Sequence, residues 1–432
     1  MPEVTEDMTA CAIETGTQID TDGAPASGTA VIDGAEAEPK ASVVPGARVT
    51  RRSGFSIAVD GSYAACLADA GDGCWYPERW TLDGPEPYTV PLPGNQPEEA
   101  DSQPLPLPDG RVLIRRRVAD RHDLALLYPT GPGTGELRVG FLYGEEVRLL
   151  PPLATGSAYA LTYADGISSV WLVHGGPGLE KLAEIEGRCT GGVWLDREGR
   201  TLALDRELDG RTKAVAVDLA GGVSTPLLQI TDDSDDRVLL ADPDSGLLLV
   251  RSNAPGTERL GWGVLGSRRP VRFPESLRAE GAQGAAGAEG AEDAAGAEDT
   301  VITPVSVQPG QLLMPESCAV ALRIDGPGGT VPALWRPDGP APVRVSAPQG
   351  WLAGAVTWSP RGTLRLPYAT PECPCGLADV EPVVPLVPPE PTTAPAVPPA
   401  EPKGPGPGSG WRKRRALPRV LPLQQAPLAV QP

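Results

Sequence analysis

The chain has 432 residues, and 37 basic against 56 acidic side chains give it a formal net charge of -19. This charge favours solubility and argues against non-specific binding to nucleic acid or anionic membranes, because an acidic protein repels phosphate. The N-terminus has neither the basic nor the apolar stretch of a secretory signal, and no apolar run approaches the roughly 20 residues of a membrane span. We therefore expect a cytoplasmic protein that binds neither nucleic acid nor membrane.

The seven cysteines are scattered, which fits a reducing compartment better than a disulfide framework. Cys373-Pro374-Cys375 has the close spacing of a metal or redox pair. The chain has only two histidines and no second cysteine pair to complete such a site. We expect cysteines in loops or small buried cysteines, and no metal or cofactor.

Three segments have the composition of flexible chain. Residues 1–47 carry nine carboxylates against the single Lys40 and few large apolar residues, which predicts a disordered acidic tail. Residues 279–299 contain six carboxylates, no basic residue and frequent Gly, which predicts a solvated acidic insertion. Residues 387–417 are rich in Pro, which predicts an extended insertion.

Between these segments a tight turn that introduces an apolar strand recurs seven times. The turns lie at Asp60-Gly61, Asp109-Gly110, Thr155-Gly156, Glu198-Gly199, Ser245-Gly246, Glu316-Ser317 and Arg361-Gly362. The intervals between their second residues are 49, 46, 43, 47, 71 and 45 residues, and the interval of 71 contains the 21-residue acidic insertion. The chain therefore has seven units of nearly equal length.

Each unit has the same internal order. A strand precedes the turn, as at Gly192–Leu195, and an apolar strand follows it, as at Thr201–Leu204. A polar hairpin such as Asp209-Gly210 leads to a further strand such as Ala214–Val217, and a Gly/Pro turn leads to the last one, as at Tyr88–Val90. Four short strands in a unit of this length are typical of a propeller blade.

The turns of two units also resemble a known family. Trp358-Ser-Pro-Arg-Gly362 and Trp194-Leu-Asp-Arg-Glu-Gly199 are similar to the W-S-P-D-G turn of TolB-like propellers and of the propeller domain in prolyl-oligopeptidase-type serine peptidases. The pattern departs from the WD-repeat (WD40) family, because no unit shows its G-H and W-D dipeptides. The expected fold class is all-β: a seven-bladed β-propeller of four-stranded blades over residues 48–430, with the two insertions above.

The end of the chain suggests how the last blade is completed. Gly376–Val380 has the pattern of its third strand, and Arg419–Leu423 resembles the outer strand of other units. On this interpretation residues 387–417 are an insertion between two strands. Residues 47–50 are a candidate partner for the final blade, and such a pairing would hide two strand edges.

Three motifs suggest chemistry, and each has a simpler interpretation. His174-Gly-Gly-Pro-Gly178 resembles the oxyanion loop of proline iminopeptidases, but the sequence has no G-x-S-x-G nucleophile and no later histidine, so we expect a turn between strands. Asp232–Asp236 is a possible calcium loop, and a solvated loop between two blades explains it better. The basic run Arg412–Arg415 has a local solubilising role as its simplest explanation.

No catalytic, cofactor-binding or metal-ligating residue is therefore assigned, and the sequence favours a protein that is not an enzyme. Our first hypothesis is a non-catalytic, monomeric propeller scaffold that binds a protein or peptide partner through its loops. The alternative follows from the resemblance alone. It is a prolyl-oligopeptidase-like protein of the serine peptidase family whose α/β-hydrolase domain is absent or lies on another chain.

Overall fold

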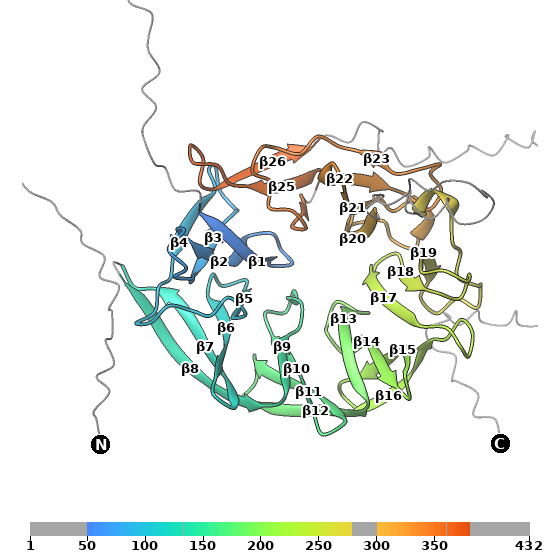
Figure 1. Cartoon of the computed structure of the whole chain (residues 1–432), viewed down its shortest axis with the longest axis horizontal. Coiled ribbons are helices and arrows are strands. Elements are labelled where there is room, and N and C mark those ends of the chain that lie inside the picture. The colour runs from blue at the N-terminus through green and yellow to red at the C-terminus, as the bar shows by residue number, and fades with distance from the viewer. Residues whose placement is uncertain (1–49, 132, 279–299, 360, 381–432) are drawn as a thin grey trace, which may run out of the picture. The chain divides into compact units, whose positions relative to one another are not determined.

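A computed structural model describes residues 50–131, 133–278, 300–359 and 361–380, within one compact unit that starts at Val49. These residues form seven antiparallel sheets, called here blades 1 to 7 in chain order. Figure 1 shows the blades following one another around a central space, from β1 to β26. The three segments with flexible composition, residues 1–47, 279–299 and 387–417, lie outside the described residues.

Each blade begins with an inner strand and ends at the periphery. The inner strands are β1 (Arg51–Ile57), β5 (Gln103–Pro106), β9 (Glu146–Leu149), β13 (Arg188–Trp194), β17 (Asp236–Ala241), β20 (Val301–Val307) and β24 (Thr357–Trp358). The second strands are β2 (Tyr63–Asp69), β6 (Val112–Val118), β10 (Ala158–Ala164), β14 (Thr201–Leu208), β18 (Leu247–Ser252), β21 (Val320–Gly326) and β25 (Leu364–Tyr368). The third strands are β3 (Tyr76–Thr81), β7 (Arg121–Pro129), β11 (Ile167–His174), β15 (Arg211–Asp218), β19 (Arg259–Val264), β22 (Gly329–Trp335) and β26 (Gly376–Val380). The outer strands are β4 (Tyr88–Pro91), β8 (Thr134–Tyr143), β12 (Glu180–Glu186), β16 (Val223–Leu228) and β23 (Val343–Arg344).

Two blades have three strands rather than four in the described chain. In blade 5 a single antiparallel bridge, from Trp262 of β19 to Arg272, takes the place of a full outer strand. In blade 7 the third strand, Gly376–Val380, is where the sequence predicts it, and the predicted outer strand Arg419–Leu423 lies outside the described residues. The strand order confirms the seven-bladed β-propeller.

Most of the second strands begin with an apolar run, because both of their faces are buried between blades there. In β6, Leu113 packs in the core between blades 2 and 3, while Val112 and Ile114 pack in the core between blades 1 and 2. Successive side chains of a strand point to opposite faces, so one short run of Val, Leu and Ile serves two interfaces. Seven such cores lie in the described chain, one for each pair of neighbouring blades.

The turns between the first and second strands lie where the repeat predicts all seven of them. In six of these turns the predicted Gly has a φ between 72° and 81°, a left-handed conformation that side chains with a Cβ disfavour. At Gly199 a Cβ would also lie 2.2 Å from Cδ2 of Leu153. Blade 6 has no Gly at the predicted position and replaces the tight turn by residues 308–319, which include the 3-10 helix η3 (Pro315–Ser317).

The ring closes between blades 7 and 1 by side-chain packing. Cys375 of blade 7 packs in one core with Trp80 of blade 1, and Arg52 donates a hydrogen bond of 3.2 Å to the carbonyl of Pro374. β1 pairs with β2 of its own blade. The sequence suggested that residues 47–50 pair with the final blade. The strand that follows them directly, β1, does not pair with that blade.

In the described part of the chain, the remaining regular structure is the 3-10 helix η1 (Glu275–Leu277), after β19. Within the described ranges, no helix has the length and apolar character that crossing a membrane requires.

Candidate binding site

A cavity of about 560 Å³ opens at the centre of the ring, at the ends of the inner strands. Six blades contribute to its wall, each through the last residues of its inner strand or the turn that follows. The wall segments are residues 57–59, 151–154, 192–194, 239–241, 305–307 and 356–358. We call the side of the ring that carries these first turns the turn face, and the side with the hairpins between second and third strands the hairpin face.

The wall is largely apolar and includes two tryptophans. Trp194 is fixed in place because its Nε1 donates a hydrogen bond of 3.0 Å to the carbonyl of Pro151 in the neighbouring blade, and its ring packs edge-on against Tyr159. The indole Nε1 of Trp358 is buried and has no hydrogen-bond partner. A buried donor without a partner is unfavourable for the fold.

The charged residues of the cavity lie on the turns of blades 4 and 5. Arg197 forms a two-pronged ion pair with Asp244, in which Nε donates to Oδ1 and Nη2 donates to Oδ2. The carboxylate of Asp196 accepts hydrogen bonds from the backbone of its own turn, and that of Asp242 does the same. The cavity rim therefore carries a small net negative charge on a rigid base.

Exposed apolar side chains lie beside these charges. Leu312, Leu313 and Met314, in the long turn of blade 6, are 67%, 86% and 40% exposed, and Val59 in the turn of blade 1 is 57% exposed. The backbone N–H of Leu313 donates a hydrogen bond of 3.2 Å to the carbonyl of Asp244, which places this loop at the cavity rim. Leu313 also has a φ of +54°, a strained conformation for a Leu.

Below the cavity, a buried carboxyl lies against a glycine bulge of the inner strand. The pairing of β13 with β14 shifts register near Gly191, where a Cβ would lie 2.6 Å from Oδ2 of Asp205. Oδ1 of Asp205 accepts a hydrogen bond of 2.9 Å from the backbone of Val238 in the next blade. Burial raises the pKa of Asp205 to about 6, although this hydrogen bond and the nearby Arg237 and Arg148 act to lower it.

The structure places the two histidines apart and outside the cavity wall. His174 ends β11, and residues 175–179 form the turn to β12, as the sequence predicts. Its Nε2 lies 3.5 Å from Nη2 of Arg111, and burial together with that charge lowers the pKa of His174. His122 lies in β7 with Nδ1 3.3 Å from Arg115. Neither histidine is next to a candidate nucleophile in these contacts.

The cysteine pair is in the loop before β26. Cys375 is buried in the core between blades 7 and 1, and burial raises the pKa of its thiol to about 12. The Cys373 thiol donates a hydrogen bond of 3.4 Å to the carbonyl of Cys375. In the described parts of the chain, no three His, Cys, Asp or Glu side chains are placed to hold a metal ion.

The Asp232–Asp236 segment links blade 4 to blade 5, and its carboxylates point to separate partners. Asp236 is fully buried and pairs with Lys213 at 2.9 Å, while Asp235 accepts a hydrogen bond of 2.8 Å from the backbone of Thr212. The segment is thus a loop between blades, as the sequence predicts. The sequence also predicts a solvated loop, and Asp236 differs because it is buried. The basic run 412–415 lies outside the described residues.

The sequence did not identify the residues of the cavity and its rim, although one signal was present. Three consecutive apolar residues, Leu312–Met314, interrupt an otherwise polar turn. Their position at the cavity rim depends on the closed ring, which the sequence does not specify residue by residue.

No protein-family model matches the chain, and no curated protein matches it either. Among solved structures, TolB from Acinetobacter baumannii is similar, with 10% identity, a TM-score of 0.38 and coverage of 76% of this chain and 78% of that one. Puromycin hydrolase has 15% identity, a TM-score of 0.49 and coverage of 77% and 52%. The Pyrococcus horikoshii acylaminoacyl peptidase has 10% identity, a TM-score of 0.46 and coverage of 77% and 51%. The chain thus spans about half the length of these two hydrolases, and similarity at this level concerns the propeller fold alone.

Proposed function

We propose that this chain is a non-catalytic, monomeric propeller that binds a protein or peptide partner at the turn face, over the central cavity. The observation that carries the proposal is the group of exposed apolar residues at the cavity rim, Val59 and Leu312–Met314. Exposed apolar groups beside a concave site are typical of recognition surfaces, because their burial against a partner is favourable.

We propose that the partner binds through an extended segment that carries at least one large apolar side chain. The cavity is about 560 Å³ in volume, which is within the range of sites that hold a few residues or a small molecule. Its wall offers the rings of Trp194 and Trp358 for packing, and aromatic residues commonly carry much of the energy of an interface. The net charge of -19 supports the further proposal that neither nucleic acid nor membrane is the partner.

A peptide selection with matched variants tests this function. Random peptides displayed on phage are selected on the immobilised protein, and the affinity of the enriched peptides is measured by fluorescence anisotropy. Leu313→Asp on the turn face should weaken binding by about tenfold or more, because it places a charge where an apolar contact forms. Ile167→Asp is the control, since Ile167 is 45% exposed at a hairpin on the hairpin face.

Enriched peptides that bind Leu313→Asp as tightly as wild type, or that lose affinity equally in Ile167→Asp, would contradict the proposed site. The peptidase-like alternative is tested separately with a serine-directed fluorophosphonate probe. We expect no saturable labelling of this chain, because the sequence contains no G-x-S-x-G motif.

A further inference from the structure

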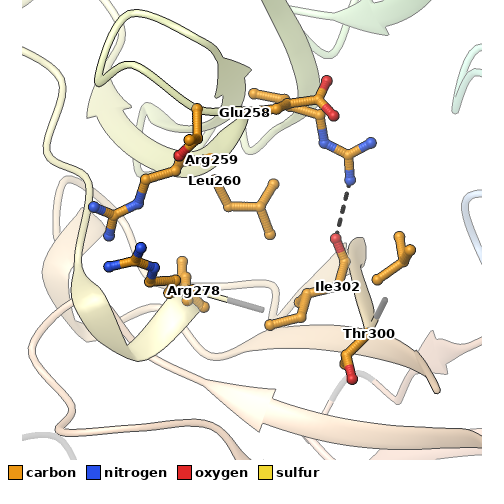
Figure 2. A pocket seen from close by; sticks show the side chains of 10 residues that line it. Glu258, Arg259, Leu260, Arg278, Thr300 and Ile302 are labelled. Carbon is orange, nitrogen blue, oxygen red and sulfur yellow. Dashed lines mark hydrogen bonds between the residues drawn. The ribbon is translucent and has the colours of Figure 1, made fainter. Parts of the chain in front are cut away.

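A second pocket, of about 300 Å³, lies between blades 5 and 6 and is separate from the central cavity. It is formed by the β18 to β19 hairpin region of blade 5 and the start of β20 in blade 6. In Figure 2, Leu260 lies in the middle of the pocket, with Arg278 on one side and Ile302 and Thr300 on the other. The pocket combines an apolar floor with a charged rim.

The floor is an opening of the core between the two blades. Leu260, Leu277 and Ile302 are 5%, 3% and 8% exposed, and all three belong to that core. Such a floor favours an apolar group of a ligand, because burying apolar area contributes about 25 cal/mol per Å².

Arg251 brings a charge to the end of this apolar surface. It follows Leu247 and Leu249 at alternate positions of β18, and these two leucines face blade 6. Nη2 of Arg251 donates a hydrogen bond of 3.0 Å to the carbonyl of Ile302, which is the dashed line in Figure 2. Within the described residues no carboxylate lies within ion-pair distance of Arg251, and the bond to Ile302 is its one side-chain hydrogen bond there.

The neighbouring charges distinguish Arg251 from the rest of the rim. Arg259 is already engaged, because Nη1 pairs with Glu275 at 2.9 Å and Nη2 donates to the carbonyls of Phe273 and Pro274. Glu258 is exposed at the rim and forms no ion pair with Arg251 among the described contacts. Arg278 likewise pairs with Glu275, at 3.5 Å, so Arg251 is the pocket arginine that makes no ion pair with a described residue.

We propose that this pocket binds an apolar group that carries a carboxylate, with the carboxylate on Arg251 and the apolar group on Leu260, Leu277 and Ile302. A guanidinium presents parallel N–H donors that match the two oxygens of a carboxylate. Two sources supply this chemistry: a free carboxylic acid with an alkyl chain, and the C-terminal residue of a peptide with an apolar side chain.

Isothermal titration calorimetry on the full chain tests the proposal and separates the two sources. The probes are octanoate with 1-octanol as its uncharged control, and acetyl-Gly-Gly-Leu with its C-terminal amide as control. We expect at least one acid to bind and its uncharged control to bind at least about tenfold more weakly, because the Arg–carboxylate pair is lost. Binding of octanoate alone assigns a free acid, and binding of the peptide acid alone assigns a chain terminus.

Three variants complete the test. Arg251→Gln should weaken acid binding about ten- to a hundredfold, and Glu258→Gln should strengthen it a few-fold, because a repelling charge is removed. Arg344→Gln, at an exposed arginine of β23, should leave it unchanged. Absence of binding by both acids overturns the proposal, and so does an Arg251→Gln variant that keeps the melting temperature and the affinity of wild type.

Discussion

Asp205 is a residue whose burial has a measurable consequence for stability. Its pKa is about 6 in the folded chain, because burial disfavours the charged form, and an ordinary Asp has a pKa of about 3.9. Between these values the folded state holds a proton that the unfolded state has lost. The stability that Asp205 contributes therefore falls as the pH rises from about 4 to about 6.

Asp205→Asn should remove this pH dependence, because the amide oxygen still accepts the hydrogen bond from Val238 and no longer ionises. The difference in free energy of unfolding, variant minus wild type, should therefore be about 2 kcal/mol larger at about pH 7.5 than at about pH 4. Urea titrations at both values measure it. Asp120→Asn, at an exposed position, is the control and should run parallel to wild type; a parallel curve for Asp205→Asn would contradict the burial argument.

Leu313 combines strain with exposure, which gives a prediction of opposite effects on stability and binding. Its φ of +54° is unfavourable for Leu, and its side chain is 86% exposed, so little packing is lost on substitution. Leu313→Asn should raise stability by about 1 kcal/mol, because Asn tolerates the left-handed region. It should also weaken the binding of the selected peptides to the protein. A thermal melt and an anisotropy titration check both effects, and a lower melting temperature would show that the side chain supports the fold.

At the scale of elements, the first turn of each blade and the strands around it could be predicted from the sequence, because a turn that needs positive φ selects Gly. Gly61 and Gly362 mark the first and last such turns, and both have a φ above 70°. Blade 6 follows the period without that glycine, because residues 308–319 form a longer loop. The outer strand at Tyr88–Val90 was also predicted and lies within β4, whereas in the described chain blade 5 has a single bridge in place of its expected outer strand.

The candidate sites were less predictable than the strands. The cavity wall combines single short segments from six blades, and no local pattern relates Pro151 to Trp358. Arg251 is preceded by the apolar run Leu247–Val250, and its position beside Ile302 depends on how blade 6 packs. Such sites arise from tertiary packing, and the periodicity of the sequence does not predict which residues of different blades come together.

The outer strand of blade 7 remains a prediction, tested by two deletions. β26 is the last strand of its sheet in the described chain, so its outer edge has no partner there. Truncation after Ala416 removes Val420, Leu421, Leu423 and Leu428, each worth roughly 1.5 to 3 kcal/mol if fully buried, and should lower the melting temperature markedly. Deletion of residues 280–298 should change it little, because loop-closure entropy varies slowly with length. The reverse pattern would show that residues 419–423 are not the outer strand.

At the scale of the molecule, the join between blades 7 and 1 rests on a buried ion pair within blade 1, whose Arg52 also donates a hydrogen bond to the carbonyl of Pro374 in blade 7. Nε of Arg52 lies 2.7 Å from Oε2 of Glu78, both side chains are about 5% exposed, and the indole of Trp80 donates to the same carboxylate at 3.0 Å. Arg52 also lies over the ring of Trp80, 5.3 Å from its centroid. These contacts hold Arg52 in the position from which it reaches Pro374 of blade 7, beside the core that the two blades share.

Glu78→Gln should destabilise the protein by about 3 to 5 kcal/mol, because it leaves the Arg52 charge buried without a counterion. The double variant Arg52→Met with Glu78→Leu should recover most of that loss, since no buried charge remains. Asp379→Asn is the control: it removes an exposed partner of Arg365 and should cost less than about 1 kcal/mol. Equal losses for Glu78→Gln and Asp379→Asn in chemical denaturation would contradict this account of ring closure.

The most direct test of the central claim, that a partner binds at the turn face, is to map where a selected peptide lies. A peptide from the phage selection is made with a benzophenone side chain at its apolar position, cross-linked by light to the protein, and the attachment sites are found by mass spectrometry. Because the exposed apolar residues at the rim are the proposed contacts, we predict attachment at Val59, Leu312, Leu313 or Met314. Attachment mainly at the hairpin face, around Ile167, or along the outer strand β8, would contradict the claim.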